Sequence, residues 1–207
     1  MIANKFSYAF VDASFLISRN LFVVTKDKEI SEMNPGDVVK LTIQTLNKLA
    51  RDWGITCDKI LLIGDEWDRN LEGGYIRANM IKDYIKYKGS RKYMNEKLFE
   101  ELKRDPNVTE EELKTAEHEL AVNKVKYAAK QIIKTELKKY GLPWFSYPGY
   151  EFDDIATLAS FQLYNQTPKM NVIVTKDSDL SYSLCPNCCQ FLLPPKGSEP
   201  KIITYDE

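Results

Sequence analysis

Three short apolar runs, each followed by an aspartate, constrain the fold of this 207-residue chain more than any other feature. They are YAFV at 8–11, KILLIG at 59–64 and NVIVT at 171–175. Short runs of this kind, rich in β-branched residues, are typical of strands that are buried on both faces of a parallel sheet. Parallel strands need crossover connections, which are usually helices, so helices are expected between the runs.

The segment between the first two runs predicts such a helix. Residues 36–53 carry apolar side chains at helical spacing, Asn34 and Pro35 provide a start, and Gly54 provides an end. A further helix is expected to begin near Glu151, shortly before the third run. The pattern therefore indicates strand–helix–strand crossover units.

A long charged segment separates the second and third runs. Residues 77–140 predict long helices with a break at 105–107, and Thr109 followed by Glu112 is a capping-box pattern that opens the second helix. The predicted fold class is therefore α/β, with a mostly parallel central sheet flanked by helices. We expect a single domain spanning 1–207 that carries this helical insertion.

Acidic residues gather where the predicted strands end. The acids at or just after the three strands are Asp12, Asp65, Asp177 and Asp179, and the acids at the start of the late helix are Glu151, Asp153 and Asp154. The carboxyl ends of parallel strands share one edge of the sheet, where open α/β sheets bind their ligands. Each acid taken alone could be a turn former or a helix cap, so the prediction rests on their combination.

Carboxylates held this close would repel one another and raise one another's pKa. Mg²⁺ and Mn²⁺ relieve the repulsion, because they prefer oxygen ligands and keep waters that phosphate oxygens can join. Two such ions about 3.5–4 Å apart can activate a water and stabilise the leaving oxygen of a phosphodiester. The acids therefore indicate metal-assisted phosphodiester hydrolysis.

The composition excludes several other functions. A single histidine, His118, excludes zinc sites built from several histidines, and 29 basic against 30 acidic residues exclude a uniformly basic surface for nucleic acid. Four cysteines are too few and too clustered for a disulfide framework. No apolar run approaches the roughly 18 residues of a membrane span, and the N-terminus lacks a signal core, so a soluble cytoplasmic protein is expected.

The cysteine motif and the histidine are both predicted to be structural. Cys185-Pro-Asn-Cys188 offers one C-x-x-C, whereas a structural zinc site usually needs four ligands. Its Pro-Asn pair favours a turn between two short strands, at 180–184 and 190–193. His118 lies in a charged helix and is expected on its surface.

Two basic segments complement the acids. Residues 75–92 and 124–139 each contain six Lys or Arg and one acid, and tyrosines are interleaved in the first. Basic helices with aromatic residues suit phosphate tracking and base stacking, although a basic run can also be a solvated helix face. The residues predicted to bind nucleic acid in this way are Lys82, Tyr84, Lys86, Tyr87 and Lys92.

In this order along the chain, the motifs resemble the 5′-nuclease superfamily of flap endonucleases, the 5′-nuclease domain of bacterial DNA polymerase I and bacteriophage-type RNase H. FVDASFL (10–16) and LLIGDEW (61–67) are similar to the family's first two strands, each of which ends in a metal-ligand aspartate. YEFDDIATLA (150–159) is similar to its acidic helix start, and VTKDSDL (174–180) to a strand end with two ligand aspartates.

The resemblance implies a Rossmann-like, PIN-like fold, and it assigns roles to the acids. The implied metal ligands are Asp12, Asp65, Glu151, Asp153, Asp154, Asp177 and Asp179, with Asp68 as a weaker alternative to Asp65. YKGSR (87–91) is similar to the basic segment that opens the family's helical arch, where a Lys and an Arg reach the scissile phosphate. Lys88 and Arg91 occupy those places, and Arg77 matches an upstream arginine.

One part of the family pattern is expected to be absent. A helix–three-turn–helix segment with further metal ligands follows the last matched strand in the family, whereas this sequence stops at KIITYDE. One metal site would then be complete while the second lacks ligands.

The resemblance implies a 5′→3′ exonuclease and flap endonuclease of the phage RNase H type, with two Mg²⁺ or Mn²⁺ ions in a complete site. It would remove RNA primers or 5′ flaps in DNA replication, in the host cytoplasm if phage-encoded. Its partners would be DNA and RNA–DNA hybrids with a 5′ end or flap, and single-strand-binding or other replication proteins. The alternatives are a PIN-type ribonuclease and a non-catalytic nucleic-acid-binding replication module.

Overall fold

The computed structural model describes residues 6–71, 75–76, 94–164, 166–167, 169–177, 180–181, 184–193 and 201–205. Several predicted site residues lie outside these ranges, so their placement is not described: Arg77, Lys82, Tyr84, Lys86, Tyr87, Lys88, Arg91, Lys92 and Asp179.

The centre of the molecule is a six-stranded sheet in the order β3-β2-β1-β4-β5-β6. The strands are β1 (Phe6–Asp12), β2 (Ile60–Ile63), β3 (Trp144–Phe145), β4 (Met170–Thr175), β5 (Cys188–Leu192) and β6 (Lys201–Ile203). All neighbours pair in parallel except β5 and β6, which are antiparallel. The three apolar runs form the adjacent strands β2, β1 and β4, so the predicted α/β fold with a mostly parallel sheet is confirmed.

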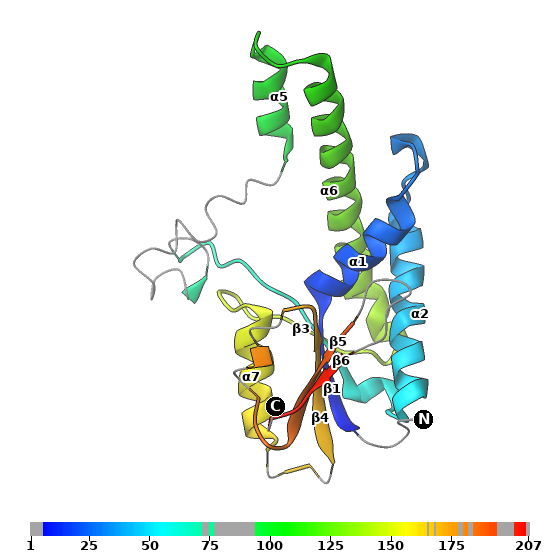
Figure 1. Ribbon diagram of the computed structural model, residues 1–207, viewed down its shortest axis with the longest axis vertical. Helices are drawn as coiled ribbons and strands as arrows, with labels where there is room; N and C mark the ends of the chain where they lie inside the picture. Colours follow the sequence, from blue (N-terminus) through cyan, green and yellow to red (C-terminus); the bar gives the residue numbers. More distant parts are fainter. Residues whose placement is uncertain are drawn as a thin grey trace.

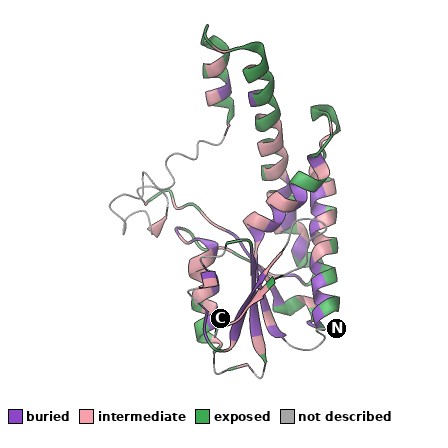
Figure 2. Ribbon diagram, in the orientation of Figure 1, coloured by how far each residue is buried: buried purple, intermediate pink, exposed green. Residues whose placement is uncertain are grey.

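Helices cover both faces of this sheet (Figure 1). On one face lie α1 (Ala13–Thr25), α2 (Pro35–Trp53) and the second half of α6 (Glu110–Glu136), and on the other lies α7 (Phe152–Gln162). Within β1, Ala9 and Val11 belong to the first core and Phe10 to the second. Because both faces are buried, the central strands β1, β2, β4 and β5 are mainly apolar, and most of their residues are buried, shown as purple in Figure 2.

Helix α2 begins and ends as the sequence predicts. The Asn34 side chain accepts the Gly36 N–H at 2.8 Å, and Pro35 is the first helical residue. Gly54 ends the helix with a φ of 62°, in the left-handed region that favours glycine.

Helix α1 has no counterpart among the helices predicted from the sequence. Its apolar residues occupy most of its circumference, because Leu16, Ile17 and Leu21 are buried while Phe22 and Val23 are exposed. Such a helix gives no clear 3.6-residue periodicity, which is the signal on which prediction depends.

The helical insertion consists, in its described part, of α5 (Glu96–Arg104), α6 and the short η4 (Leu137–Tyr140). The predicted break at 105–107 separates α5 from α6, and the predicted capping box forms, since Thr109 Oγ1 accepts the Glu112 N–H at 3.2 Å. The helices expected within 94–140 are therefore confirmed.

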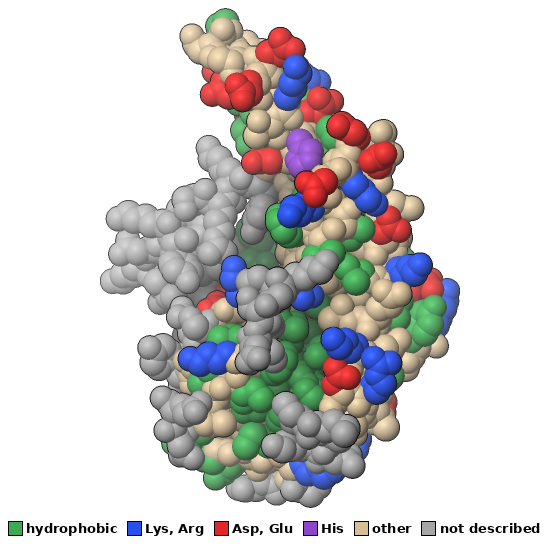
Figure 3. All heavy atoms as spheres, turned by 45° about the vertical axis from the view of Figure 1, so that its right-hand side comes forward, with side chains coloured by type: hydrophobic (Ala, Val, Ile, Leu, Met, Phe, Trp, Pro, Cys, Tyr) green, Lys and Arg blue, Asp and Glu red, His purple; other side chains and the backbone are tan. Residues whose placement is uncertain are grey.

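Helix α5 and the first half of α6 project away from the sheet (Figure 1) and are largely exposed (Figure 2). His118 lies on the surface of this projection among acidic and basic side chains, as predicted (Figure 3). The second half of α6 returns to the core, where Ala129 and Ile133 are buried against α1 and α2.

The chain around the cysteines agrees only partly with the prediction. Pro186 and Asn187 form the expected turn, and β5 supplies the second strand. The first strand, expected at 180–184, is wrong where the chain is described, because Leu180 and Ser181 lie in a 3₁₀ turn. Short apolar runs do not distinguish a strand from a helical turn by periodicity alone.

Two short 3₁₀ helices complete the described elements, η1 (Ile30–Glu32) and η2 (Cys57–Lys59). None of the helices in the described ranges is both long enough and apolar enough to span a membrane.

Candidate active site

Aspartates follow three neighbouring strands at the same edge of the sheet. Asp12 is the last residue of β1 and pairs with Ile63, the last residue of β2. Asp65 follows β2 by two residues, and Asp177 follows β4, the other parallel neighbour of β1, by two residues. The predicted positions of these aspartates at the carboxyl edge are confirmed.

Hydrogen bonds fix the Asp12 carboxylate between two elements. Its Oδ1 accepts the Phe15 N–H at 2.9 Å, which caps α1, and its Oδ2 accepts the Thr175 hydroxyl at 3.2 Å. The Thr175 Oγ1 in turn accepts the Asp177 N–H at 3.2 Å. Asp12 therefore serves as a helix cap and is also tied to the chain that carries Asp177.

The Asp65 carboxylate joins three segments that are far apart in the sequence. Its Oδ2 accepts the Ser14 hydroxyl at 3.3 Å, and its Oδ1 accepts the Phe152 N–H at 2.8 Å. The second bond places the first turn of α7 beside the end of β2. Asp65 thus brings the acidic start of α7 to the edge that holds Asp12.

The acids at the start of α7 differ in exposure. Glu151 is buried, whereas Asp153 and Asp154 are half-buried. The Asp154 Oδ2 accepts the Glu151 N–H at 3.1 Å, so Asp154 also stabilises the start of its own helix. The first turn of α7 is therefore capped by its own Asp154 and also donates the Phe152 N–H to Asp65.

The charge state of Asp12 reflects this crowding. Burial, together with the negative charges of Asp65 and Asp153, raises the pKa of Asp12 from 3.8 to about 6. The Phe15 N–H and the Thr175 hydroxyl oppose the rise, because both favour the charged form. The edge therefore carries negative charge that the protein's own groups do not fully compensate.

A row of lysines on α6 faces these acids. Lys126, Lys130 and Lys134 are four residues apart, so they share one face of the helix. Lys130 Nζ donates to the Asp65 backbone oxygen at 3.2 Å, and Lys134 Nζ lies 3.7 Å from the Glu66 carboxylate. We call these three residues the α6 lysine row.

Burial lowers the pKa of both Lys126 and Lys130 below its usual value, while the negative charge of Asp65 acts in the opposite direction on both. The remaining lysines of segment 124–139 are exposed, and two of them pair with surface acids: Lys124 with Glu96 and Lys139 with Glu136. The segment is thus partly a solvated face and partly a wall of the site. The spacing of four residues was the sequence signal for this wall.

The loop after β2 is shaped by a glycine packed on an indole ring. A Cβ at Gly64 would lie 2.4 Å from the Trp144 ring, so a larger residue could not hold Asp65 in this position without displacing Trp144. The backbone of Glu66 also holds this loop in place. Its N–H donates to the Tyr150 carbonyl oxygen at 3.2 Å, and its carbonyl oxygen accepts the Gly149 N–H at 2.8 Å. The sequence predictions did not include these contacts.

A buried glutamine holds the chain at Asp177. Gln190, in β5, is fully buried, and its Nε2 donates to the Asp177 backbone oxygen. Within the described part of the chain its Oε1 has no hydrogen-bond partner. No signal in the sequence marked this residue, because a single Gln in an apolar run has many possible roles.

The donor atoms at this edge are carboxylate oxygens, which Mg²⁺ and Mn²⁺ prefer. Among the residues that the structure describes, no three or more His, Cys, Asp and Glu side chains are grouped so that they could hold a metal ion. Burial beside the negative charges of Asp65 and Asp153 raises the pKa of Asp12, and a bound divalent cation would favour its charged form. The donor chemistry therefore fits such an ion, and the individual metal ligands stay predictions.

No protein-family model and no curated protein matches the sequence. Among solved structures, the chain is similar to the bacteriophage T5 5′-exonuclease with bound zinc ions, with a TM-score of 0.58 and 19% identity over 94% of this chain and 57% of that one. It is also similar to the T5 flap endonuclease in a pseudo-enzyme–product complex with DNA and metal ions (TM-score 0.56, 19% identity, 90% and 55% covered). A T5 protein co-crystallised with metal ions gives a TM-score of 0.53 at 19% identity, with 90% and 54% covered.

The chain thus spans a little over half the length of these T5 chains. It has their fold, which confirms the α/β, PIN-like fold that the resemblance implies.

Proposed function

We propose that this chain, which has the fold of the T5 5′-exonucleases, is a divalent-metal-dependent nuclease that hydrolyses phosphodiesters. The observation that carries the proposal is the convergence of Asp12, Asp65 and the first turn of α7 opposite the α6 lysine row. Acids that hold cations, beside lysines that attract a polyanion, are what cleavage of a nucleic acid requires.

The acids divide into two groups in this proposal. Asp12, Asp65, Asp154 and Asp177 would hold the better-formed ion site, and Glu151, Asp153 and Asp179 would flank it and contribute to a second. Bound Mg²⁺ or Mn²⁺ ions, two in a complete site, supply activation of a water and neutralisation of charge on the leaving oxygen. The Thr175 hydroxyl orients Asp12, and the α7 backbone orients Asp65.

Basic residues would bind the substrate phosphates. Lys126 and Lys130 are half-buried next to Asp12 and Asp65, so a phosphate that enters between them would meet little competing water. Lys88 and Arg91, with Arg77 upstream, would stabilise charge on the scissile phosphate. The nucleic-acid strand would pass along the helical insertion. We assign its binding there to Lys82, Tyr84, Lys86, Tyr87 and Lys92.

The proposed reaction is 5′→3′ exonuclease and flap endonuclease cleavage of the phage RNase H type, which removes RNA primers or flaps in replication. DNA is supported as a partner by the T5 flap endonuclease, whose structure contains DNA. We also propose RNA–DNA hybrids as substrates, replication proteins as partners and a cytoplasmic location.

Cleavage of a 5′-flap DNA by the full chain in Mg²⁺ tests the assignment. We expect EDTA to abolish cleavage because it removes the ions, and Asp177→Asn to abolish cleavage because it removes a proposed ligand. The matched surface variant Asp52→Asn should retain cleavage. Asp52 is a suitable control because its side chain is exposed, and its carboxylate is only weakly paired, at 3.9 Å, with the exposed Arg51.

Full cleavage by Asp177→Asn would overturn the metal assignment. Cleavage of single-stranded RNA in preference to the forked DNA would favour the PIN-type ribonuclease. DNA binding without cleavage in either metal would favour a non-catalytic module.

A further inference from the structure

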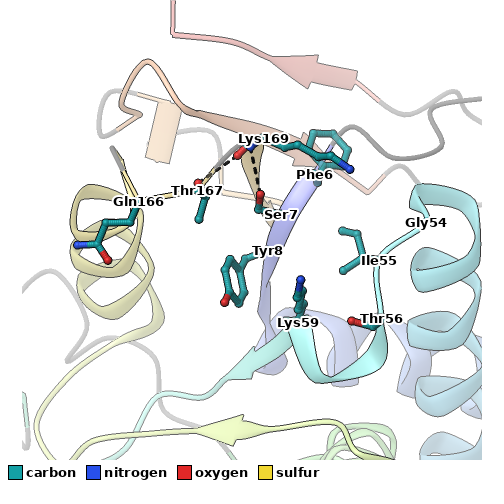
Figure 4. Close-up of a pocket in the computed structure, with 10 residues that line it drawn as sticks. All are labelled: Phe6, Ser7, Tyr8, Gly54, Ile55, Thr56, Lys59, Gln166, Thr167 and Lys169. Atoms are coloured by element: carbon teal, nitrogen blue, oxygen red, sulfur yellow. Dashed lines mark hydrogen bonds between the residues drawn. The ribbon is translucent and has the colours of Figure 1, made fainter.

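A cavity of about 260 Å³ opens at the opposite, amino-terminal edge of the sheet. Three segments form its walls: the start of β1 at 6–8, the chain at 54–59 that follows α2, and the chain at 166–169 that precedes β4 (Figure 4). Strand β1 runs from this cavity to Asp12, and its seven residues span about 20 Å. The cavity is therefore separate from the candidate active site.

Two lysines give the cavity a positive charge. Lys59 reaches toward its centre and Lys169 lies across it beside Phe6 (Figure 4). No Asp or Glu lines the walls, and neither ammonium has a carboxylate partner among the residues that the structure describes. The Lys59 Nζ lies 6.0 Å from the centre of the Tyr8 ring. Two cations without counter-charges favour an anionic ligand.

Polar and apolar groups complete the walls. The Ser7 Oγ accepts the Lys169 N–H at 3.2 Å, which leaves its proton available to a ligand oxygen. The buried Phe6 and Ile55 form the apolar floor, and the half-buried Tyr8 adds an aromatic face. A ligand suited to these walls has one end that carries several negative oxygens and one end that is flat and apolar.

From this arrangement we infer that the cavity binds a nucleoside monophosphate. The phosphate lies between Lys59 and Lys169 and accepts the Ser7 hydroxyl, and the base packs on Phe6, Tyr8 and Ile55. The volume of about 260 Å³ is small for a ligand site, which suits a single nucleotide. This site goes beyond the proposed nuclease function and does not depend on it.

Titration of the full chain with dAMP tests this inference. EDTA keeps the opposite edge free of metal, and calorimetry measures binding. Tryptophan fluorescence gives a second signal, because one of the three tryptophans, Trp53, packs on Phe6 with ring centres 5.3 Å apart. We expect the double variant Lys59→Gln/Lys169→Gln to weaken binding at least about tenfold, since it removes two charge-assisted hydrogen bonds. The matched control Lys40→Gln/Lys48→Gln removes two exposed charges from α2 and should bind normally.

Adenosine and inorganic phosphate separate the two ends of the ligand. We expect each to bind at least about tenfold more weakly than dAMP, because each makes only part of the contacts. The inference is overturned if dAMP does not bind, if the double variant binds it as the parent does, or if phosphate alone binds as tightly. Flap cleavage by the double variant should stay unchanged, so failure here leaves the proposed nuclease untouched.

Discussion

Replacement of Asp12 by Asn should make the metal-free protein more stable at neutral pH. Burial and the nearby acids raise the pKa of Asp12 from 3.8 to about 6, so the folded protein holds the charged form at a cost. The difference of roughly two pH units, at about 1.36 kcal/mol for each, corresponds to about 3 kcal/mol. Asp12 is half-buried, and solvent screening therefore makes about 3 kcal/mol an upper value.

The sign follows from proton binding. Between pH 3.8 and about 6 the folded protein retains a proton on Asp12 that the unfolded chain releases, so stability falls as pH rises through this window. Asn carries no charge and does not titrate, and its Oδ1 can still accept the Phe15 N–H that caps α1. The stability advantage of Asp12→Asn should therefore grow from about pH 4 to pH 6 and then level off.

Urea unfolding in EDTA, followed by tryptophan fluorescence at several pH values, measures this difference. The control is Asp52→Asn, which removes a charge from an exposed position and should leave the pH dependence of the parent unchanged. A constant difference between Asp12→Asn and the parent from pH 4 to pH 8 would refute the reasoning, because the charge on Asp12 would then cost nothing.

Three further predictions concern the supports of the site. Lys130→Gln should slow flap cleavage about tenfold through loss of one charge at the phosphate, whereas the exposed Lys138→Gln should not; equal rates would contradict the role of the α6 lysine row. Gly64→Ala should lower the free energy of unfolding by about 1–3 kcal/mol in urea, because its Cβ would meet the Trp144 ring; unchanged stability would show that the ring moves freely. Gln190→Leu should fold with near-parent stability, yet it should cleave more slowly because the Asp177 backbone oxygen loses its hydrogen bond from Gln190. Parent-like cleavage rates would show that Gln190 does not support the site.

The sequence predicts the acidic edge because the geometry of parallel strands is simple. Once three runs are recognised as strands of one sheet, their carboxyl ends must share an edge, and Asp12, Asp65 and Asp177 come with them. Capping residues such as Asn34 and Thr109 are similarly readable, because they act within a few residues of their position.

Other features depend on packing between distant segments, which no local pattern records. Helix α1 is apolar around most of its surface, so its period is hidden, and the two-residue β3 is too short to give a signal. The spacing of the α6 lysine row predicts that its members share one helix face, but the direction of that face toward the acids is set by how Ala129 and Ile133 pack on α1 and α2. The cavity at the amino-terminal edge likewise joins three segments that are far apart in the sequence: the start of β1, the chain at 54–59, and Gln166, Thr167 and Lys169.

The central claim is that the acidic edge of the sheet binds divalent cations. A crystal of the full chain grown with Mn²⁺, with anomalous scattering recorded at the manganese edge, tests it directly. We expect a peak within coordination distance of carboxylate oxygens of Asp12, Asp65 and Asp177, and we expect this peak to disappear in Asp177→Asn. An ordered edge without any such peak at saturating Mn²⁺ would contradict it.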